Sequence, residues 1–232
     1  MKNKPWATHK QLKKEEMPSK EQVIAIARSI NHLRERALFI VAYLTGGRIS
    51  EIVREPYLRK VEYKKEIVTD AAGNKKVAIA RTDNKSAIQI NVERQELNYK
   101  GIRRDNISWS YKDGRRILTI SMQNRKNKKA KRKRIPLPYD KEKELLDMLM
   151  EFLDKLQADE PLFPFGKSKA ELIIKRVTGM NPHFLRAIRA TRLVIDYNFN
   201  EHKLIQYMGW SDGRPAMSYV KLNENTILGG DY

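Results

Sequence analysis

The chain contains no cysteine, and its 232 residues include 4 histidines and 3 tryptophans. The lack of cysteine excludes disulfides, a thiol nucleophile and zinc held by cysteine. Long apolar runs are also missing, because the longest, Ala37–Leu44, is far shorter than the roughly 20 residues of a membrane span. The N-terminus lacks the apolar segment of a signal peptide. We therefore expect a soluble, cytoplasmic protein with no membrane partner.

Positive charge is what the chain has in excess. Lys and Arg number 47 against 28 Asp and Glu, which gives a net charge of +19. Such an excess favours a polyanionic partner, with nucleic acid ahead of an anionic membrane surface. A lysine-rich composition inherited from an AT-rich or heat-adapted genome is the alternative, and we take it as a partial contributor. Apolar residues make up 41% of the chain, which is enough for a packed core.

Apolar residues at helical spacing predict helices in both the first and the last parts of the chain. The segment Leu33–Leu44 is apolar nearly all round in its second half, which indicates a helix at the centre of the core. A last helix is expected to begin near Pro215, with a short polar tail from Lys221. Helix starts are expected where a side chain can cap the helix, at Ser19, Asp140, Ser168, Asn181 and Asn200.

Residues 57–136 have a different character, because β-branched residues cluster between turn signals. This pattern predicts strands at Glu66–Thr69, Lys76–Ala80, Ala87–Val92, Asn106–Tyr111, Arg116–Met122 and Arg134–Leu137. The expected fold class is therefore α+β, mainly α-helical with a small antiparallel sheet.

A basic run separates the last two of these strands. Eight of the eleven residues from 124 to 134 are Lys or Arg. A solvated loop is the simpler interpretation. The sharper one is a hairpin tip that reaches the DNA backbone and carries one lysine into a reaction centre. The residues that we expect to bind DNA are Arg125, Lys129, Lys131, Arg132 and Lys133.

Three short segments could together hold and attack a phosphodiester. Arg48 follows a glycine turn, where backbone N–H groups and a helix start suit an anion. His183 and Arg186 share one face at the start of a helix. Tyr219 comes nine residues after Trp210. Taken one at a time, all but Arg186 are more simply explained as ordinary structural or surface residues, so the hypothesis depends on their occurring together.

The chemistry of such a set starts from a tyrosine nucleophile. A phenol has a pKa near 10, so it needs help to lose its proton and an activated electrophile. Two arginines can bind the non-bridging oxygens of a phosphodiester through their planar donors. A histidine can assist proton transfer, and a lysine can protonate the leaving 5′ oxygen. This is covalent and electrostatic catalysis that requires no metal or other cofactor.

The order of these residues resembles the tyrosine recombinase (phage-type integrase) family. The matching segments are LTGGRISEI at 44–52, RIPLP at 134–138, HFLRAIRAT at 183–191 and GWSDGRPAMSY at 209–219. The resemblance covers residues 17 to 222 and implies a recombinase-like catalytic domain. Four motifs in order with one correctly spaced tyrosine are specific where a single one is weak.

The resemblance implies a role for each matched residue. Arg48 and Arg186 would bind the scissile phosphate, and Tyr219 would form a 3′-phosphotyrosyl link to DNA. Trp210 takes the place where most members have a second histidine, and an indole can donate a hydrogen bond but cannot shuttle a proton. The implied catalytic set is Arg48, Lys126, Lys128, His183, Arg186, Trp210 and Tyr219, with Lys126 preferred over Lys128. Glu51 would orient the short helix after Arg48.

The resemblance also implies partners and a domain organisation. Double-stranded DNA would be the substrate, and a homotetramer on paired DNA sites would carry out recombination or integration of a mobile element. Residues 1–16 would be a basic arm and residues 17–232 the catalytic domain, with no N-terminal core-binding domain. Residues 57–104 exceed the usual link and would be an extra β-rich insertion.

Three other functions remain open at this stage. A type IB topoisomerase shares much of the same active-site plan and would nick and reseal one strand. A non-catalytic DNA-binding protein would keep the basic surface without the chemistry. A polybasic membrane-surface protein is less favoured, because no amphipathic anchor helix accompanies the charge.

Overall fold

The computed structural model describes residues 17–53, 57–69, 72–73, 75–81, 92–98, 101–122 and 133–227. The chain divides into two compact units, one formed by Met1–Glu55 with Lys100–Tyr232 and the other by Pro56–Tyr99. No helix in the described part of the chain is long and apolar enough to cross a membrane.

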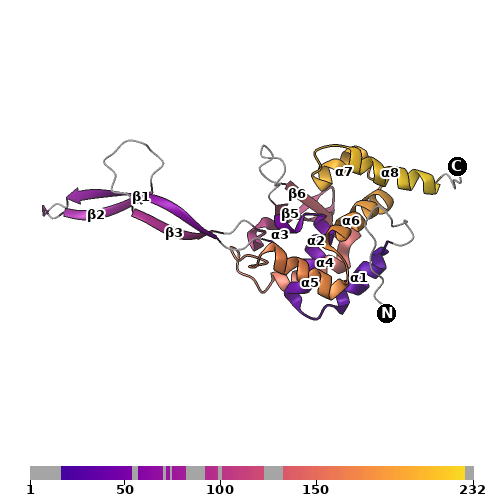
Figure 1. The fold of residues 1–232 in the computed structure, drawn as a ribbon, viewed down its shortest axis with the longest axis horizontal. Coiled ribbons are helices and arrows are strands. Elements are labelled where there is room, and N and C mark those ends of the chain that lie inside the picture. The colour runs from indigo at the N-terminus through magenta and orange to yellow at the C-terminus, as the bar shows by residue number, and fades with distance from the viewer. Residues whose placement is uncertain are drawn as a thin grey trace. The chain divides into compact units, whose positions relative to one another are not determined.

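The larger unit is a bundle of helices built around α2 (Leu33–Thr45) (Figure 1). Every residue of α2 from Ala37 to Thr45 is buried, as expected for a helix that is apolar nearly all round. Helices α1, α4, α5 and α6 pack against it. The other helices are α1 (Lys20–Ser29), α3 (Ile49–Ile52), α4 (Tyr139–Leu153), α5 (Lys167–Thr178), α6 (Pro182–Tyr197), α7 (Glu201–Met208) and α8 (Arg214–Ile227), with a 3₁₀ turn at Arg104–Asn106.

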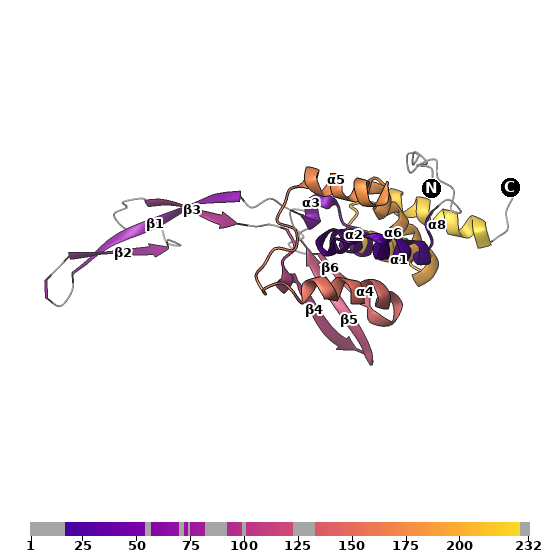
Figure 2. The ribbon, with the colours of Figure 1, turned by 90° about the horizontal axis from the view of Figure 1, so that it is seen from below.

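An antiparallel sheet of three strands completes this unit. Its strands are β4 (Ile107–Lys112), β5 (Arg115–Met122) and β6 (Lys133–Pro138), in that order, and α4 packs on β5 and β6 (Figure 2). Ile107, Ile120 and Ile135 are aligned across the sheet and buried, so this face belongs to the core. The register also pairs Lys133, the first residue of β6, with Met122 at the end of β5.

The smaller unit is a second antiparallel sheet of three strands, in the order β2-β1-β3. Its strands are β1 (Tyr57–Thr69), β2 (Lys75–Arg81) and β3 (Val92–Asn98). The predicted strands Glu66–Thr69 and Lys76–Ala80 are confirmed and form a hairpin, because Glu66 pairs with Ala78 and Thr69 with Lys75. Of the predicted strand Ala87–Val92, only Val92 lies within the described residues, and it begins β3.

The predicted α+β class, mainly α-helical with antiparallel sheet, is confirmed, and most helix starts follow the predicted caps. The Ser19 side chain accepts from Gln22 N, and the side chains of Asn181 and Asn200 cap α6 and α7. The caps at Asp140 and Ser168 are wrong.

Those two helices begin earlier than their predicted caps, because the chain already turns into helix after an extended residue. Pro138 precedes α4 and Gly166 precedes α5, so Asp140 and Ser168 lie inside the first helical turn. An acidic side chain such as Asp140 still interacts favourably with the helix dipole there. The last helix also runs past Lys221, where a tail was expected, since α8 continues to Ile227.

Candidate DNA-cleavage site

Arg48 projects from a tight turn between α2 and α3. Gly46 ends α2 in the left-handed conformation, with φ 53°, and a Cβ at this residue would lie 2.9 Å from Met208 Sδ. Only glycine adopts this conformation at little cost. Arg48 is the residue before α3, and its N–H donates to Glu51 Oε2 at 2.9 Å while Nη1 lies 3.0 Å from Oε1. The predicted orienting role of Glu51 agrees with these contacts.

Arg186 reaches the same turn from α6, although the two arginines are far apart in the chain. Its guanidinium donates to the carbonyls of Gly46 and Met208, the latter at 2.7 Å. The residue is buried, and both acceptors are neutral, so its positive charge is not cancelled by a bound carboxylate. Burial and the neighbouring Arg48 lower the pKa of Arg186 to about 10, which leaves it charged at neutral pH.

A cavity of about 190 Å³ opens where α3, α5 and α6 begin. Arg48, His183 and Arg186 line it, so three predicted residues from two separate motifs come together here. His183 is exposed, and its backbone N–H donates to the Asn181 side chain that caps α6. Backbone N–H groups at helix starts and two arginines make this cavity suited to an anion.

Trp210 and Tyr219 form a stack beside Arg186. Their rings lie 5.8 Å apart at 7°, and the Arg186 guanidinium lies 5.5 Å from the centre of the Trp210 ring. Burial raises the pKa of Tyr219, while the nearby Arg186 acts in the opposite direction. The Tyr219 phenol is therefore neutral in the free protein, and a base or a bound substrate would have to assist its ionisation.

Lys133 lies among the same charged groups. Its Nζ is buried without a hydrogen-bond partner in the described structure. Burial, together with Arg186 and Arg48 and against the opposing effect of Glu51, lowers the pKa of Lys133 to about 7. We expected this residue to bind DNA as part of the basic run, and sequence alone did not indicate that it lies beside both arginines. The other residues predicted from the run lie outside the described part of the chain: Arg125, Lys126, Lys128, Lys129, Lys131 and Arg132.

Sequence reasoning also missed part of the cavity wall. Ser50 contributes from α3, and Lys167 and Glu171 contribute from α5, where they form an ion pair of 3.5 Å. No motif marks α5, and only the packing of α5 on α3 and α6 reveals its contribution. In the described part of the chain, no group of three or more His, Asp or Glu side chains is arranged to hold a metal ion.

Comparison with known proteins gives one distant likeness. No family model and no curated protein sequence matches the chain. The XerH site-specific recombinase, solved in a pre-cleavage complex with its difH substrate, is similar at 15% identity and a TM-score of 0.47. The match covers 99% of the present chain and 56% of the recombinase, so the present chain spans little more than half of that length. A likeness this distant has no bearing on function.

Proposed function

We propose that this chain is a tyrosine recombinase that cleaves and rejoins DNA through a covalent bond to Tyr219. One observation carries the proposal. The buried guanidinium of Arg186 lines the anion-suited cavity with Arg48 and also lies over the stack that contains Tyr219. A phosphate bound by the two arginines would therefore lie next to a phenol.

The reaction follows from these groups. The Tyr219 phenol gives up its proton to a base or to solvent as its oxygen attacks the phosphorus. The bond from phosphorus to the 5′ oxygen breaks, and the strand is left as a 3′-phosphotyrosyl ester. The 5′ oxygen takes up one proton as it leaves. Attack on the ester by the 5′-hydroxyl of another strand reverses these steps and releases Tyr219.

Arg48 and Arg186 would stabilise the transition state. Negative charge grows on the non-bridging oxygens as the fifth bond to phosphorus forms, and charged donors that are already in position favour it. Arg48 is held by Glu51, and Arg186 is held by two carbonyls, so neither has to reorganise during the reaction. His183, on the same cavity wall, is suited to a hydrogen bond or proton transfer to the phosphate.

A lysine would protonate the leaving oxygen. The resemblance at the basic run 124–134 favours Lys126, and then Lys128, as this acid, and both assignments stay predictions. The buried ammonium of Lys133 supports a third candidate, because a pKa of about 7 suits an acid that must give up its proton near neutral pH. Neighbouring Arg48 and Arg186 would then help to expel that proton.

Partners and domain organisation follow as parts of the same proposal. Residues 17–232 would be the catalytic domain, with residues 1–16 as a basic arm and a β-rich insertion. The substrate would be double-stranded DNA, bound through the surplus of basic residues, and the active form a homotetramer on paired sites. Its affinity for DNA would fall steeply as salt rises, because basic side chains release counterions from the phosphates.

A nicked suicide substrate tests the proposal. Loss of a short fragment downstream of the nick prevents rejoining, so wild type should accumulate a covalent protein–DNA adduct, detected as a shifted band under denaturing conditions. Tyr219→Phe removes the attacking oxygen and should form no adduct. Tyr197→Phe, which removes the oxygen of a phenol that bonds to Glu142 instead, is the matched control and should still form it.

The outcomes test the nucleophile and distinguish recombination from the two alternative functions. An adduct that persists in Tyr219→Phe would refute this nucleophile. DNA binding without any adduct in wild type would favour a non-catalytic DNA-binding protein. Relaxation of supercoiled DNA without joined products from two DNA sites would favour the topoisomerase alternative.

A further inference from the structure

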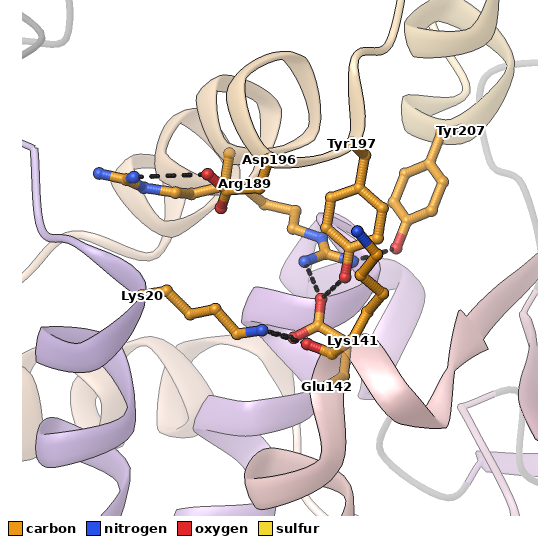
Figure 3. A network of polar contacts seen from close by, with 8 residues as sticks. Lys20, Lys141, Glu142, Arg189, Asp196, Tyr197 and Tyr207 are labelled. Carbon is orange, nitrogen blue, oxygen red and sulfur yellow. Dashed lines mark hydrogen bonds and ion pairs between the residues drawn. The ribbon is translucent and has the colours of Figure 1, made fainter.

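A buried ion pair lies further along α6 and involves none of the residues that line the cavity. Arg189 of α6 is fully buried, and its Nη1 lies 2.5 Å from Oε1 of Glu142 in α4, which is buried as well (Figure 3). Lys20 of α1 approaches the same carboxylate at 3.8 Å. A charge removed from water in this way is costly unless its partners are well placed.

Three tyrosines surround the Arg189 guanidinium. The rings of Tyr43, Tyr197 and Tyr207 have their centres 5.4 to 5.5 Å from it. Burial raises the pKa of all three, and it raises that of Tyr43 to about 12. These phenols are therefore neutral at physiological pH. The Tyr197 hydroxyl donates a hydrogen bond to Glu142.

Tyr207 differs from the other two because it also contacts the cleavage site. Its oxygen accepts a bond of 2.9 Å from Arg189 Nη2 and donates one of 2.6 Å to the Leu44 carbonyl. Leu44 is in the last turn of α2, where helix carbonyls have no partner within the helix. The ring of Tyr207 lies 5.7 Å from the Lys133 ammonium.

We propose that Tyr207 is a positioning residue for DNA cleavage. The Arg189–Glu142 pair orients Tyr207, and Tyr207 in turn fixes the turn that carries Arg48 and supports the Lys133 ammonium. This inference rests on the proposed function for its effect on cleavage.

The route from Tyr207 to the reacting groups is short. Leu44 is four residues before Arg48, and Arg186 binds the intervening Gly46 carbonyl. Two side chains thus hold the end of α2: Tyr207 at Leu44 and Arg186 at Gly46. Loss of the Tyr207 hydroxyl would free one of these two carbonyls. Since a displacement of about 1 Å can slow a reaction roughly 100-fold, a shift of a fraction of this distance is enough to be measured.

The second effect concerns Lys133 and depends on the ring of Tyr207. The groups that face this ammonium are Arg186 on α6, Arg48 and Glu51 at α3, and Tyr207 on α7. An aromatic face stabilises the charged form of lysine. Tyr207 therefore works with Glu51 and against the two arginines to keep Lys133 protonated near pH 7.

The first experiment compares Tyr207→Phe with Tyr197→Phe. Each change removes one hydroxyl hydrogen-bonded to the ion pair, buried in Tyr207 and part-buried in Tyr197, so both should lower the melting temperature. Only Tyr207→Phe frees the Leu44 carbonyl. We expect it to slow adduct formation on the nicked substrate about tenfold, the equivalent of one to two hydrogen bonds, with DNA affinity within about twofold of wild type. Tyr197→Phe should cleave at nearly the wild-type rate.

The second experiment follows the titration of Lys133 in the free protein by NMR, with its signal assigned from its loss in Lys133→Met. Tyr207→Phe keeps a ring beside the ammonium and should leave the midpoint unchanged. Tyr207→Met fills similar space without an aromatic face and should lower the midpoint by about half a pH unit or more.

These two measurements can fail independently. Equal rate losses in Tyr207→Phe and Tyr197→Phe would make Tyr207 a packing residue and overturn the inference. An unchanged Lys133 midpoint in Tyr207→Met would remove the role of the ring. If wild type forms no adduct, the proposed function fails, and the NMR titration still decides whether Tyr207 supports Lys133.

Discussion

Arg186 and Arg189 lie three residues apart on α6, both are buried, and their surroundings are opposite in kind. Arg186 donates to two neutral carbonyls and faces a cavity, and its pKa is lowered to about 10. Arg189 binds a carboxylate inside a ring of tyrosines, and its pKa is raised above the usual value. The charge of Arg186 stays available for an anionic ligand, whereas the charge of Arg189 is neutralised inside the protein by Glu142.

For these two arginines of α6, the difference lies in the acceptors. Arg48 also pairs with a carboxylate, but its side chain is part exposed and lines the cavity. A neutral acceptor orients a guanidinium without cancelling its field, and a buried carboxylate cancels it. Burial alone does not distinguish the two arginines, since both have almost no exposed surface. Variants of the two residues should therefore fail in different assays.

The largest expected effect is on catalysis by Arg186. Arg186→Ala removes a preorganised cation and should slow adduct formation by roughly 100- to 1,000-fold. The melting temperature should change much less than it does in Arg189→Ala, because no buried carboxylate is left unpaired. Single-turnover cleavage and thermal unfolding of the same samples check this. A rate loss below about tenfold would contradict a phosphate-binding role for Arg186.

The next effect is on stability and concerns Arg189. Arg189→Ala leaves Glu142 buried without its main partner and should cost about 3–5 kcal/mol of unfolding free energy. The double variant Arg189→Met, Glu142→Leu removes both charges and should recover most of that loss. Denaturant unfolding gives both values. If the double variant is as unstable as the single one, packing rather than charge explains the cost.

The smallest effect is a gain in stability at Lys133. A lysine whose pKa is lowered to about 7 in the folded protein destabilises it at every pH below the unfolded value of 10.5. Lys133→Met should therefore raise the melting temperature, by roughly 2–4 °C for each kcal/mol recovered. The gain should be complete at pH 7 and below and should vanish as the pH approaches 10.5.

The same variant sharpens the choice among the lysines. If Lys133 protonates the leaving oxygen, Lys133→Met should cleave slowly, and a substrate with sulfur in place of the bridging 5′ oxygen should restore the rate, because a thiolate leaves without a proton. Lys126→Met and Lys128→Met are the matched controls. A sulfur rescue confined to Lys126→Met would assign the acid to the basic run.

Much of the fold could be predicted from local patterns. The apolar surface of Leu33–Leu44 indicated a central helix, and α2 is buried from Ala37 onward. Side chains at Ser19, Asn181 and Asn200 marked real helix starts, since capping is a local hydrogen bond. The caps at Asp140 and Ser168 failed because the chain entered the helix at Pro138 and Gly166, and neither helix start required a side-chain cap.

The sequence by itself determined which chemical groups occur and in what order: an arginine after a glycine turn, a histidine and an arginine on one helix face, and a tyrosine after a tryptophan. These are local features, so residue spacing could indicate them. Only the tertiary structure decided that Lys133 lies beside Arg48 and Arg186, and that Arg189 is neutralised while Arg186 is not. The physical reason is that a side chain's charge depends on its burial and on partners contributed by other elements, and neither is encoded in neighbouring residues.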